Sequence, residues 1–356
     1  MMTYKETLFF VGKCLTITHE EHNKKIVEQE IKSGNVDWDN VVKVSTAHYV
    51  FPALYCNLKR ANLLSYLPEE LVNYMKHITD LNRERNLQII EQAKEINNLL
   101  LANNITPIFL KGTGNLLEGL YEDIAERMVG DIDFIVSIKQ FKIVIQLLKK
   151  DSYSESSIDY IDNTIFNRHY PKLTKAGKIS SLEVHYKMIT NDKQFNYAYI
   201  KNNLIKTKKN ITILSYNDQV LMTCFNKQIN DKGQWYKSIS LRNSYDLFLV
   251  SKLTFANKVL TSFKHPKSGY LKNFLASSCM IFNNPKSLDY TKTKSTKSFL
   301  KKQIALIENP KKNSLSKRKW NVYFLFISRL LKTIKIFYKK EYRAWFIKRL
   351  KNRLQN

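Results

Sequence analysis

The stretch from Ile105 to Val136 changes its hydrophobic period twice, and this constrains the fold more than any other part of the chain. An apolar, β-like run from Ile105 to Leu110 ends in Lys111-Gly112, a helical pattern follows, and a second β-like run begins near Asp131. Apolar residues that alternate indicate a strand, whereas apolar residues three and four apart indicate a helix. The succession of strand, glycine turn, helix and strand therefore predicts a sheet with helices beside it.

Two carboxylates lie in the second β-like run, where Asp131 and Asp133 alternate in V-G-D-I-D-F-I-V. Side chains two apart on a strand point to the same face, so these carboxylates lie side by side. Their mutual repulsion is costly unless a cation lies between them. A solvated strand end or a helix N-cap is the structural alternative, but the strand around them is apolar. We therefore expect a metal site here.

A third carboxylate is expected on a neighbouring strand. Two-metal phosphoryl transfer uses carboxylates to hold two divalent ions, and Mg²⁺ prefers such oxygen ligands. Glu183 lies in the β-like segment S-S-L-E-V-H-Y-K-M and is the candidate. The structural alternative is an edge-strand glutamate paired with a lysine.

The rest of the sequence separates into regions of different character. Residues 1–103 have a helical pattern and end in a long helix that follows Pro68, whereas residues 104–205 alternate between strands and helices. Residues 206–285 are helical again, and residues 286–356 form a basic tail with amphipathic helices. Within 104–205 we expect helices at 116–125 and 141–150, a loop at 151–163, and strands at 164–173 and 181–188. The predicted fold class is α+β, with a small mixed β-sheet core flanked by N-terminal and C-terminal helical regions.

The charge indicates an anionic partner, because 58 Lys and Arg against 31 Asp and Glu give +27. Nucleic acid, nucleotide phosphates and acidic membrane surfaces all meet this condition. The four cysteines are far apart and form no CxxC pair, which favours reduced, buried thiols. The apolar part of the first residues is too short for a secretory signal, and no apolar run is long enough to span a membrane. We therefore expect a cytoplasmic protein without a transmembrane segment.

Most of the excess charge lies in the tail, where residues 286–356 contain 21 Lys and Arg and 3 acidic residues, a net +18. The segment from Trp320 to Tyr338 is apolar nearly all round a helix, so we expect it to be buried against the body or a partner. The tail could be a solvated helix, a nucleic-acid clamp or an interfacial helix on anionic lipid. We favour a docked helix whose basic ends contact RNA or another polyanion.

The motifs of the central region resemble those of the DNA polymerase β-like nucleotidyltransferase superfamily. They are most similar to its bacterial branch of uncharacterised nucleotidyltransferases. The shared pattern is an apolar strand ending in Lys-Gly, a helix with Leu and Tyr, then R-x-x-G-D-x-D, and later an acidic residue beside a histidine. In this chain it consists of Leu110-Lys111-Gly112, Leu116, Tyr121, Arg127-Met128-Val129-Gly130-Asp131-Ile132-Asp133, Arg168-His169-Tyr170-Pro171 and Glu183-Val184-His185-Tyr186.

This resemblance implies an enzyme that moves a nucleoside monophosphate from an NTP to an acceptor and releases pyrophosphate. Asp131, Asp133 and Glu183 would be the catalytic residues and would hold two Mg²⁺ or Mn²⁺ ions. The acceptor is not identified and could be a small molecule, RNA or a protein. The rival hypothesis is a non-catalytic module that keeps the fold and binds nucleic acid with its basic surface.

The residues implied in NTP binding are Lys111, Gly112, Thr113 and Arg127. The backbone amides of Gly112 and Thr113 would contact the triphosphate at a helix N-terminus. Thr113 stands where the superfamily commonly has serine, so its hydroxyl would have to replace the serine contact. Glu183 replaces the aspartate of the family pattern, which keeps the charge but lengthens the side chain.

Several of these residues also have structural interpretations. Lys111 could cap its strand or pair with Asp131, and Arg127 could form an ion pair with Glu122 or Asp123 rather than bind phosphate.

Two further pairs have structural interpretations as well. His169 and His185 are expected to be structural, with orientation of a metal-binding carboxylate as the alternative. Arg242 and Asp246 are four residues apart, which suits an ion pair on one helix.

Overall fold

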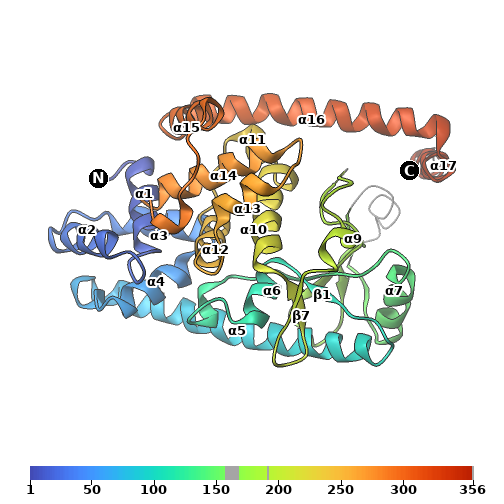
Figure 1. The fold of residues 1–356 in the computed structure, drawn as a ribbon, viewed down its shortest axis with the longest axis horizontal. Helices are drawn as coiled ribbons and strands as arrows, with labels where there is room; N and C mark the ends of the chain where they lie inside the picture. Colours follow the sequence, from blue (N-terminus) through green and yellow to red (C-terminus); the bar gives the residue numbers. More distant parts are fainter. Residues whose placement is uncertain (157–167, 191, 355–356) are drawn as a thin grey trace.

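The computed structural model describes residues 1–156, 168–190 and 192–354, and Figure 1 shows how their elements are arranged. The N-terminal part is helical, as predicted, and consists of α1 (Tyr4–Cys14), α2 (Glu21–Lys32), α3 (Trp38–Ala47), α4 (Phe51–Arg60), the 3₁₀ turn η1 (Leu64–Tyr66) and α5 (Glu69–Leu101). Helix α5 follows Pro68 and has Glu69 and Glu70 in its first turn, where the helix dipole favours negative charge. It runs along the lower edge of the molecule in Figure 1.

Helix α5 also fixes the segment that leads into the acidic strand. Its buried face carries amide side chains among the apolar ones. Asn86 donates from Nδ2 to the carbonyl oxygen of Arg127 at 2.8 Å, and Asn82 donates to that of Ala125 at 2.6 Å. Backbone carbonyls that are buried need such partners. The amides therefore tie the loop before Asp131 to the longest helix of the N-terminal part.

The central region forms a mixed sheet with the strand order β3-β4-β5-β2-β1-β7-β6 in the described residues. The strands are β1 (Ile108–Phe109), β2 (Asp131–Ile135), β3 (Ser154–Glu155), β4 (Leu173–Thr174), β5 (Ser181–His185), β6 (Leu204–Lys206) and β7 (Thr212–Leu214). β1 pairs antiparallel with β2 and parallel with β7, while β2 and β5 are parallel. The sheet thus confirms the predicted α+β class.

Most of the expected elements of this region are present. Helix α7 (Phe141–Lys150) has the predicted bounds, and β2 and β5 lie where strands were predicted. The prediction of a helix at 116–125 has the wrong bounds. The observed helix is α6 (Lys111–Glu118), which starts at the Lys-Gly turn and is capped by Gly119. The 3₁₀ turn η2 (Ile124–Glu126) follows it. Gly119 has φ +85°, a left-handed conformation that ends helices. Much of the predicted loop at 151–163 and strand at 164–173 lies outside the described residues.

A helical layer follows the sheet. It contains α9 (Tyr197–Ile200), α10 (Tyr216–Phe225), the π-helical turn η3 (Asn226–Asn230), α11 (Gly233–Tyr236), α12 (Leu241–Ser251), α13 (Ala256–Ser262), α14 (Ser268–Ile281), the 3₁₀ turn η4 (Lys286–Leu288) and α15 (Lys294–Ile307). Buried apolar side chains from Leu8 of α1 to Ile307 of α15 form one continuous core. The four cysteines are free and buried, as predicted.

The end of the chain differs from the prediction of a docked helix. α16 (Pro310–Tyr338) is one long helix with no buried residue, and α17 (Lys340–Leu354) follows it. Figure 1 shows α16 along the edge of the molecule opposite α5, where its far half extends beyond α11. The apolar sequence alone led to the expectation of burial, but the body offers this helix only a short contact at α11. None of the helices described in the structure is long and apolar enough to cross a membrane.

Candidate active site

The candidate site begins with the pairing of β2 and β5. The two strands run parallel, with Asp133 opposite Glu183 and Asp131 opposite Ser181. Residues opposite each other on neighbouring strands project from the same face, so the two acidic side chains lie side by side. Both are nearly buried, with 11% and 12% of the side chain exposed. Strand register thus brings together carboxylates that are 50 positions apart in the sequence.

Asp131 lies at the more open end of the same strand face, with 27% of its side chain exposed. Its Oδ2 accepts a hydrogen bond from Lys172 Nζ at 2.6 Å, and its Oδ1 accepts one from the hydroxyl of Ser181. Lys172 Nζ is also 3.7 Å from Glu183 Oε1. Burial lowers the pKa of Lys172, but its hydrogen bond to Asp131 and the nearby carboxylates outweigh this effect and raise it. Asp131, Asp133 and Glu183 are called the acidic group below. Lys172 thus provides one positive charge at the open side of this group.

Lys111 provides the second positive charge. Its ammonium donates to Asp133 Oδ1 and lies 3.7 Å from Glu183 Oε2. The structural alternative, a pair with Asp131, is therefore wrong. Lys111 has φ +53°, an unusual conformation for a residue with a side chain. It is held there because Leu110 N–H donates to the carbonyl oxygen of Asp133 at 2.9 Å while α6 begins immediately afterwards.

Two histidines complete the acidic group. His185 is fully buried on β5, and its Nε2 lies 2.8 Å from Asp133 Oδ1 and 3.4 Å from Glu183 Oε2. His169 Nε2 lies 3.9 Å from Glu183 Oε2. Burial would raise the pKa of Glu183, but the hydrogen bond from His185 and the charges of Lys111 and the histidines hold it well below its usual range. Glu183 is therefore ionised at neutral pH, and both histidines contact the acidic group.

The start of α6 lies next to the acidic group and forms one wall of a cavity. Lys111 and Gly112 line the cavity described below, whereas Thr113 does not. Thr113 is 1% exposed, and its hydroxyl donates to the carbonyl oxygen of Asp131 at 3.0 Å and accepts from the N–H of Asp133 at 3.4 Å. The structure therefore gives the Thr113 hydroxyl a role in joining α6 to β2, and does not direct it toward a ligand.

Arg127 is buried and forms its ion pair with a different helix from the one expected. Its Nε donates to both carboxylate oxygens of Asp246 on α12, at 2.9 and 3.1 Å, and Tyr121 donates to the same carboxylate at 2.8 Å. The expected pairs of Arg127 with Glu122 or Asp123, and of Arg242 with Asp246, are wrong. Glu122 pairs with Arg60 instead, and Asp123 pairs with Arg83.

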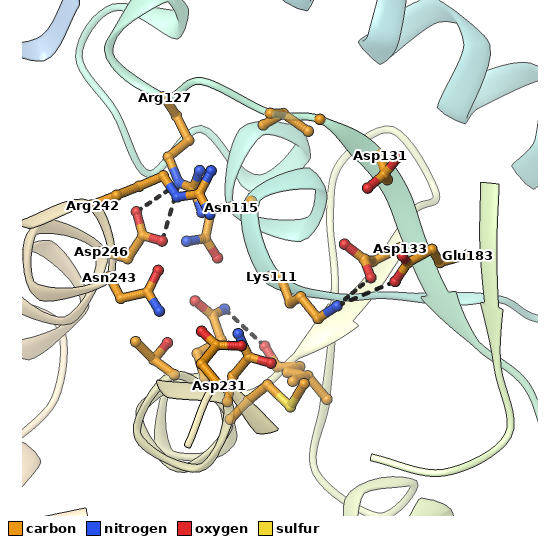
Figure 2. A pocket seen from close by; sticks show the side chains of 18 of the residues that line it. Lys111, Asn115, Arg127, Asp131, Asp133, Glu183, Asp231, Arg242, Asn243 and Asp246 are labelled. Atoms are coloured by element: carbon orange, nitrogen blue, oxygen red, sulfur yellow. Dashed lines mark hydrogen bonds and ion pairs between the residues drawn. The ribbon is translucent and has the colours of Figure 1, made fainter. Parts of the chain in front are cut away.

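These walls enclose a cavity of about 270 Å³. Figure 2 shows the acidic strands on one side of it, with Lys111 between them and the side that carries Arg127, Arg242 and Asp246. Asp231, next to η3, lies on the lower side. A π-helical turn breaks the α-helical hydrogen-bond pattern and is frequently found at functional sites. The cavity is therefore bounded by carboxylates at one end and by arginines at the other.

Some residues of the site were not predicted from the sequence, among them Lys172, which contacts Asp131 but does not line the cavity. Lys172 had no recognisable motif, and its role depends on the pairing of strands. Two arginines that line the cavity have a buried nitrogen atom without a hydrogen-bond partner among the described residues, Nη1 of Arg168 and Nε of Arg242. Burial raises the pKa of Asp231. The other lining residues that were not predicted as site residues are Asn115, Val129, Gly130, Leu214, Gln219, Met222, Thr223, Asn226, Asn243 and Asp246.

The acidic group has the donor chemistry of a metal site. Asp133, Glu183 and His185 have ligand atoms within 4.8 Å of one another, and this is the group of such side chains found within the described ranges. Asp131 is not one of these three side chains, but Lys172 Nζ links it to Glu183, with contacts of 2.6 Å and 3.7 Å. Lys111 and Lys172 already balance part of the negative charge. Carboxylate oxygens suit Mg²⁺ and Mn²⁺, whereas imidazole nitrogen suits zinc better. The residues therefore fit a divalent cation held mainly by oxygen atoms.

Fold and site together define an α+β protein with clustered carboxylates beside the glycine turn that begins a helix. The sequence profile of the family described as "Uncharacterised nucleotidyltransferase" matches residues 34–263, which is more than half of the chain. The chain belongs to this family, as its motifs predicted. No curated protein and no solved structure matches the chain significantly.

Proposed function

We propose that the protein transfers a nucleoside monophosphate from an NTP to an acceptor and releases pyrophosphate. The observation that carries this proposal is the register that places Asp133 beside Glu183 at the end of a cavity, in a member of a nucleotidyltransferase family. In this reaction an acceptor oxygen bonds to the α-phosphorus while the bond to the bridging oxygen of the leaving pyrophosphate breaks. The acceptor itself is a small molecule, RNA or a protein.

The carboxylates of Asp131, Asp133 and Glu183 would hold two Mg²⁺ or Mn²⁺ ions. These ions supply a Lewis acid that stabilises the charge on the phosphate oxygens and makes the acceptor hydroxyl more acidic. His185 donates to Asp133 and lies close to Glu183, so it orients both side chains. With Glu183 ionised at neutral pH, no proton has to leave it before a cation binds.

The remaining residues would position the NTP. Gly112 leaves room at the start of α6, since a Cβ there would lie 3.2 Å from the guanidinium carbon of Arg127. The helix N-terminus favours negative charge. We propose that Lys111, Gly112 and Arg127 contact the phosphates and that Thr113 contributes through its backbone amide.

One observation favours the rival hypothesis of a non-catalytic module. The ammonium of Lys111 already lies between Asp133 and Glu183, where it balances their charge without a metal. If a metal cannot displace it, the fold would bind ligands without chemistry. The test must therefore separate metal binding from binding in general.

The experiment uses labelled ATP, GTP, CTP and UTP with Mg²⁺ or Mn²⁺ and a broad mixture of acceptors, with mass spectrometry to detect added nucleotide mass. The wild type should label an acceptor or itself, whereas Asp133→Asn and Glu183→Gln should not. Glu91→Gln is the matched control, since Glu91 lies on α5 with 66% of its side chain exposed. Equal labelling by the wild type and the two site variants would refute the proposed site.

Thermal unfolding gives an independent measurement. A ligand that binds only the folded state raises the melting temperature. We expect a rise with NTP that needs the metal in the wild type and is lost in Glu183→Gln. A rise without any metal, equal in both proteins, would instead support the non-catalytic module.

The basic tail and the location of the protein complete the proposal. We propose that residues 286–356, with a net +18, contact a polyanion, and that the protein works in the cytoplasm, where NTPs are available. The boundaries near residues 103, 205 and 285 stay a proposal that limited proteolysis can test.

A further inference from the structure

Helix α16 exposes large apolar side chains over much of its length, and several of them lie along one line. Five residues mark it: Leu315, Val322, Phe326, Leu330 and Phe337, with between 43% and 79% of each residue exposed. An apolar surface of this extent is unusual on a soluble protein and marks an interaction site. Within the part of the chain that the structure describes, no other element covers this line.

This line points away from the body. α16 contacts the body through Phe324, whose ring lies 5.3 Å from that of Trp235 and 4.4 Å from Lys232 Nζ. A helix turns by about 100° per residue, so Val322 and Phe326, each two positions from Phe324, face roughly the opposite direction. The contact at α11 therefore orients the helix so that its apolar line faces outward.

Positive charge accompanies the line. α16 contains eight Lys and Arg residues and no acidic residue. By the same helical geometry Arg318, Lys319 and Arg329 lie beside the apolar line, and all three are exposed. An occupant of this face must therefore be apolar in part and negatively charged.

We propose that α16 lies flat on an anionic lipid bilayer, with the outward apolar line at the boundary between headgroups and acyl chains. An interfacial helix has these two features, an apolar face and basic residues that attract anionic lipid. With 29 residues the helix is about 44 Å long, which gives an extended contact along the surface. This proposal goes beyond nucleotidyl transfer and does not depend on it.

Charge and side-chain type argue against the other occupants. A second copy of α16 would bring eight further positive charges against the first, and like charges repel. Single-stranded RNA would meet the positive charge but binds through aromatic stacking. Of the five residues of the line only Phe326 and Phe337 offer a ring for a base, whereas the other three, Leu315, Val322 and Leu330, offer none.

Vesicle flotation with the full-length protein tests the proposal. We expect binding to vesicles of phosphatidylcholine with 30% phosphatidylglycerol, much weaker binding to phosphatidylcholine alone, and weakening by salt, since screening shortens the range of charge attraction. The triple variant Val322→Asn, Phe326→Asn and Leu330→Asn should bind the anionic vesicles at least tenfold more weakly. These side chains are exposed, so the melting temperature should not change.

A matched control replaces apolar residues of similar exposure elsewhere. Leu81, Leu87 and Ile143 are 49%, 52% and 50% exposed and lie on α5 and α7. Changing these three to Asn should leave vesicle binding as in the wild type.

Three results would overturn the proposal. The first is that the wild type ignores anionic vesicles, and the second is that the triple variant binds them as the wild type does. The third is that the triple variant loses a dimer, or binding to an RNA homopolymer, while the wild type does not float with vesicles. In that case the face contacts a second copy or nucleic acid instead.

Discussion

Replacing Asp246 by Leu would leave the guanidinium of Arg127 buried without its counter-charge. The two side chains are only 8% and 6% exposed, and the Arg127 Nε contacts both carboxylate oxygens. Tyr121 would lose its acceptor at the same time. A buried charge that loses its partner costs about 3–5 kcal/mol.

The expected change in melting temperature follows from the size of the chain. At about 2.1 cal/mol/K per residue, 356 residues give an unfolding entropy of roughly 0.75 kcal/mol/K if the chain unfolds as one unit. A loss of about 3–5 kcal/mol then lowers the melting temperature by about 4–7 °C. Arg127→Met alone should produce a loss of similar size, because it leaves the carboxylate buried.

A double-mutant cycle read by differential scanning calorimetry checks the reasoning. Arg127→Met together with Asp246→Leu removes both charges, so the double variant should recover most of the lost stability. Additive losses from the two single changes would refute the view that these groups stabilise each other.

Three further predictions concern other parts of the structure. Gly114→Ala should destabilise the protein by about 1–3 kcal/mol in urea unfolding, because its Cβ would lie 2.9 Å from the carbonyl oxygen of Phe109. The control Gly269→Ala, where no atom lies within 4 Å of the added Cβ, should cost nothing. Burial and the charge of Lys227 lower the pKa of His48 from 6.5 to about 4, so the unfolded chain binds more protons between these values. Stability should therefore fall as the pH falls from 6.5 to 4, and His48→Gln should show a flatter profile in urea titrations at several pH values. Deleting residues 310–356 should abolish vesicle flotation and leave the NTP-dependent rise in melting temperature unchanged, and loss of both would contradict a tail that is separate from the site.

The sequence predicted the acidic strand because a strand places alternate residues on one face, a rule that needs no tertiary information. It also indicated Glu183, whose segment has a β-like pattern of its own. It could not predict Lys172 or Asp246 as partners. Lys172 reaches Asp131 because β4 pairs beside β5, and Asp246 reaches Arg127 because α12 packs across the loop before β2. Such contacts depend on packing between distant segments.

The start of α6 and the exposure of α16 were missed for different reasons. The Lys-Gly turn was interpreted as a break between elements, but Lys111 adopts a left-handed conformation and the helix starts there. For α16 the apolar residues were interpreted as a sign of burial. Hydrophobicity indicates that a surface needs a partner, but it does not say whether the partner belongs to the same chain.

The two lysines of the acidic group have a consequence for how the protein would take up metal. Because Lys111 and Lys172 neutralise Asp131, Asp133 and Glu183 in part, the strands can pair during folding before any cation arrives. Under the proposed function, metal uptake would be an exchange in which ammonium groups are released from the carboxylates and freed to meet an incoming anion. A metal and a polyphosphate would therefore bind with positive cooperativity, each making room for the other. Titrating metal with and without NTP in a calorimeter would measure that coupling directly.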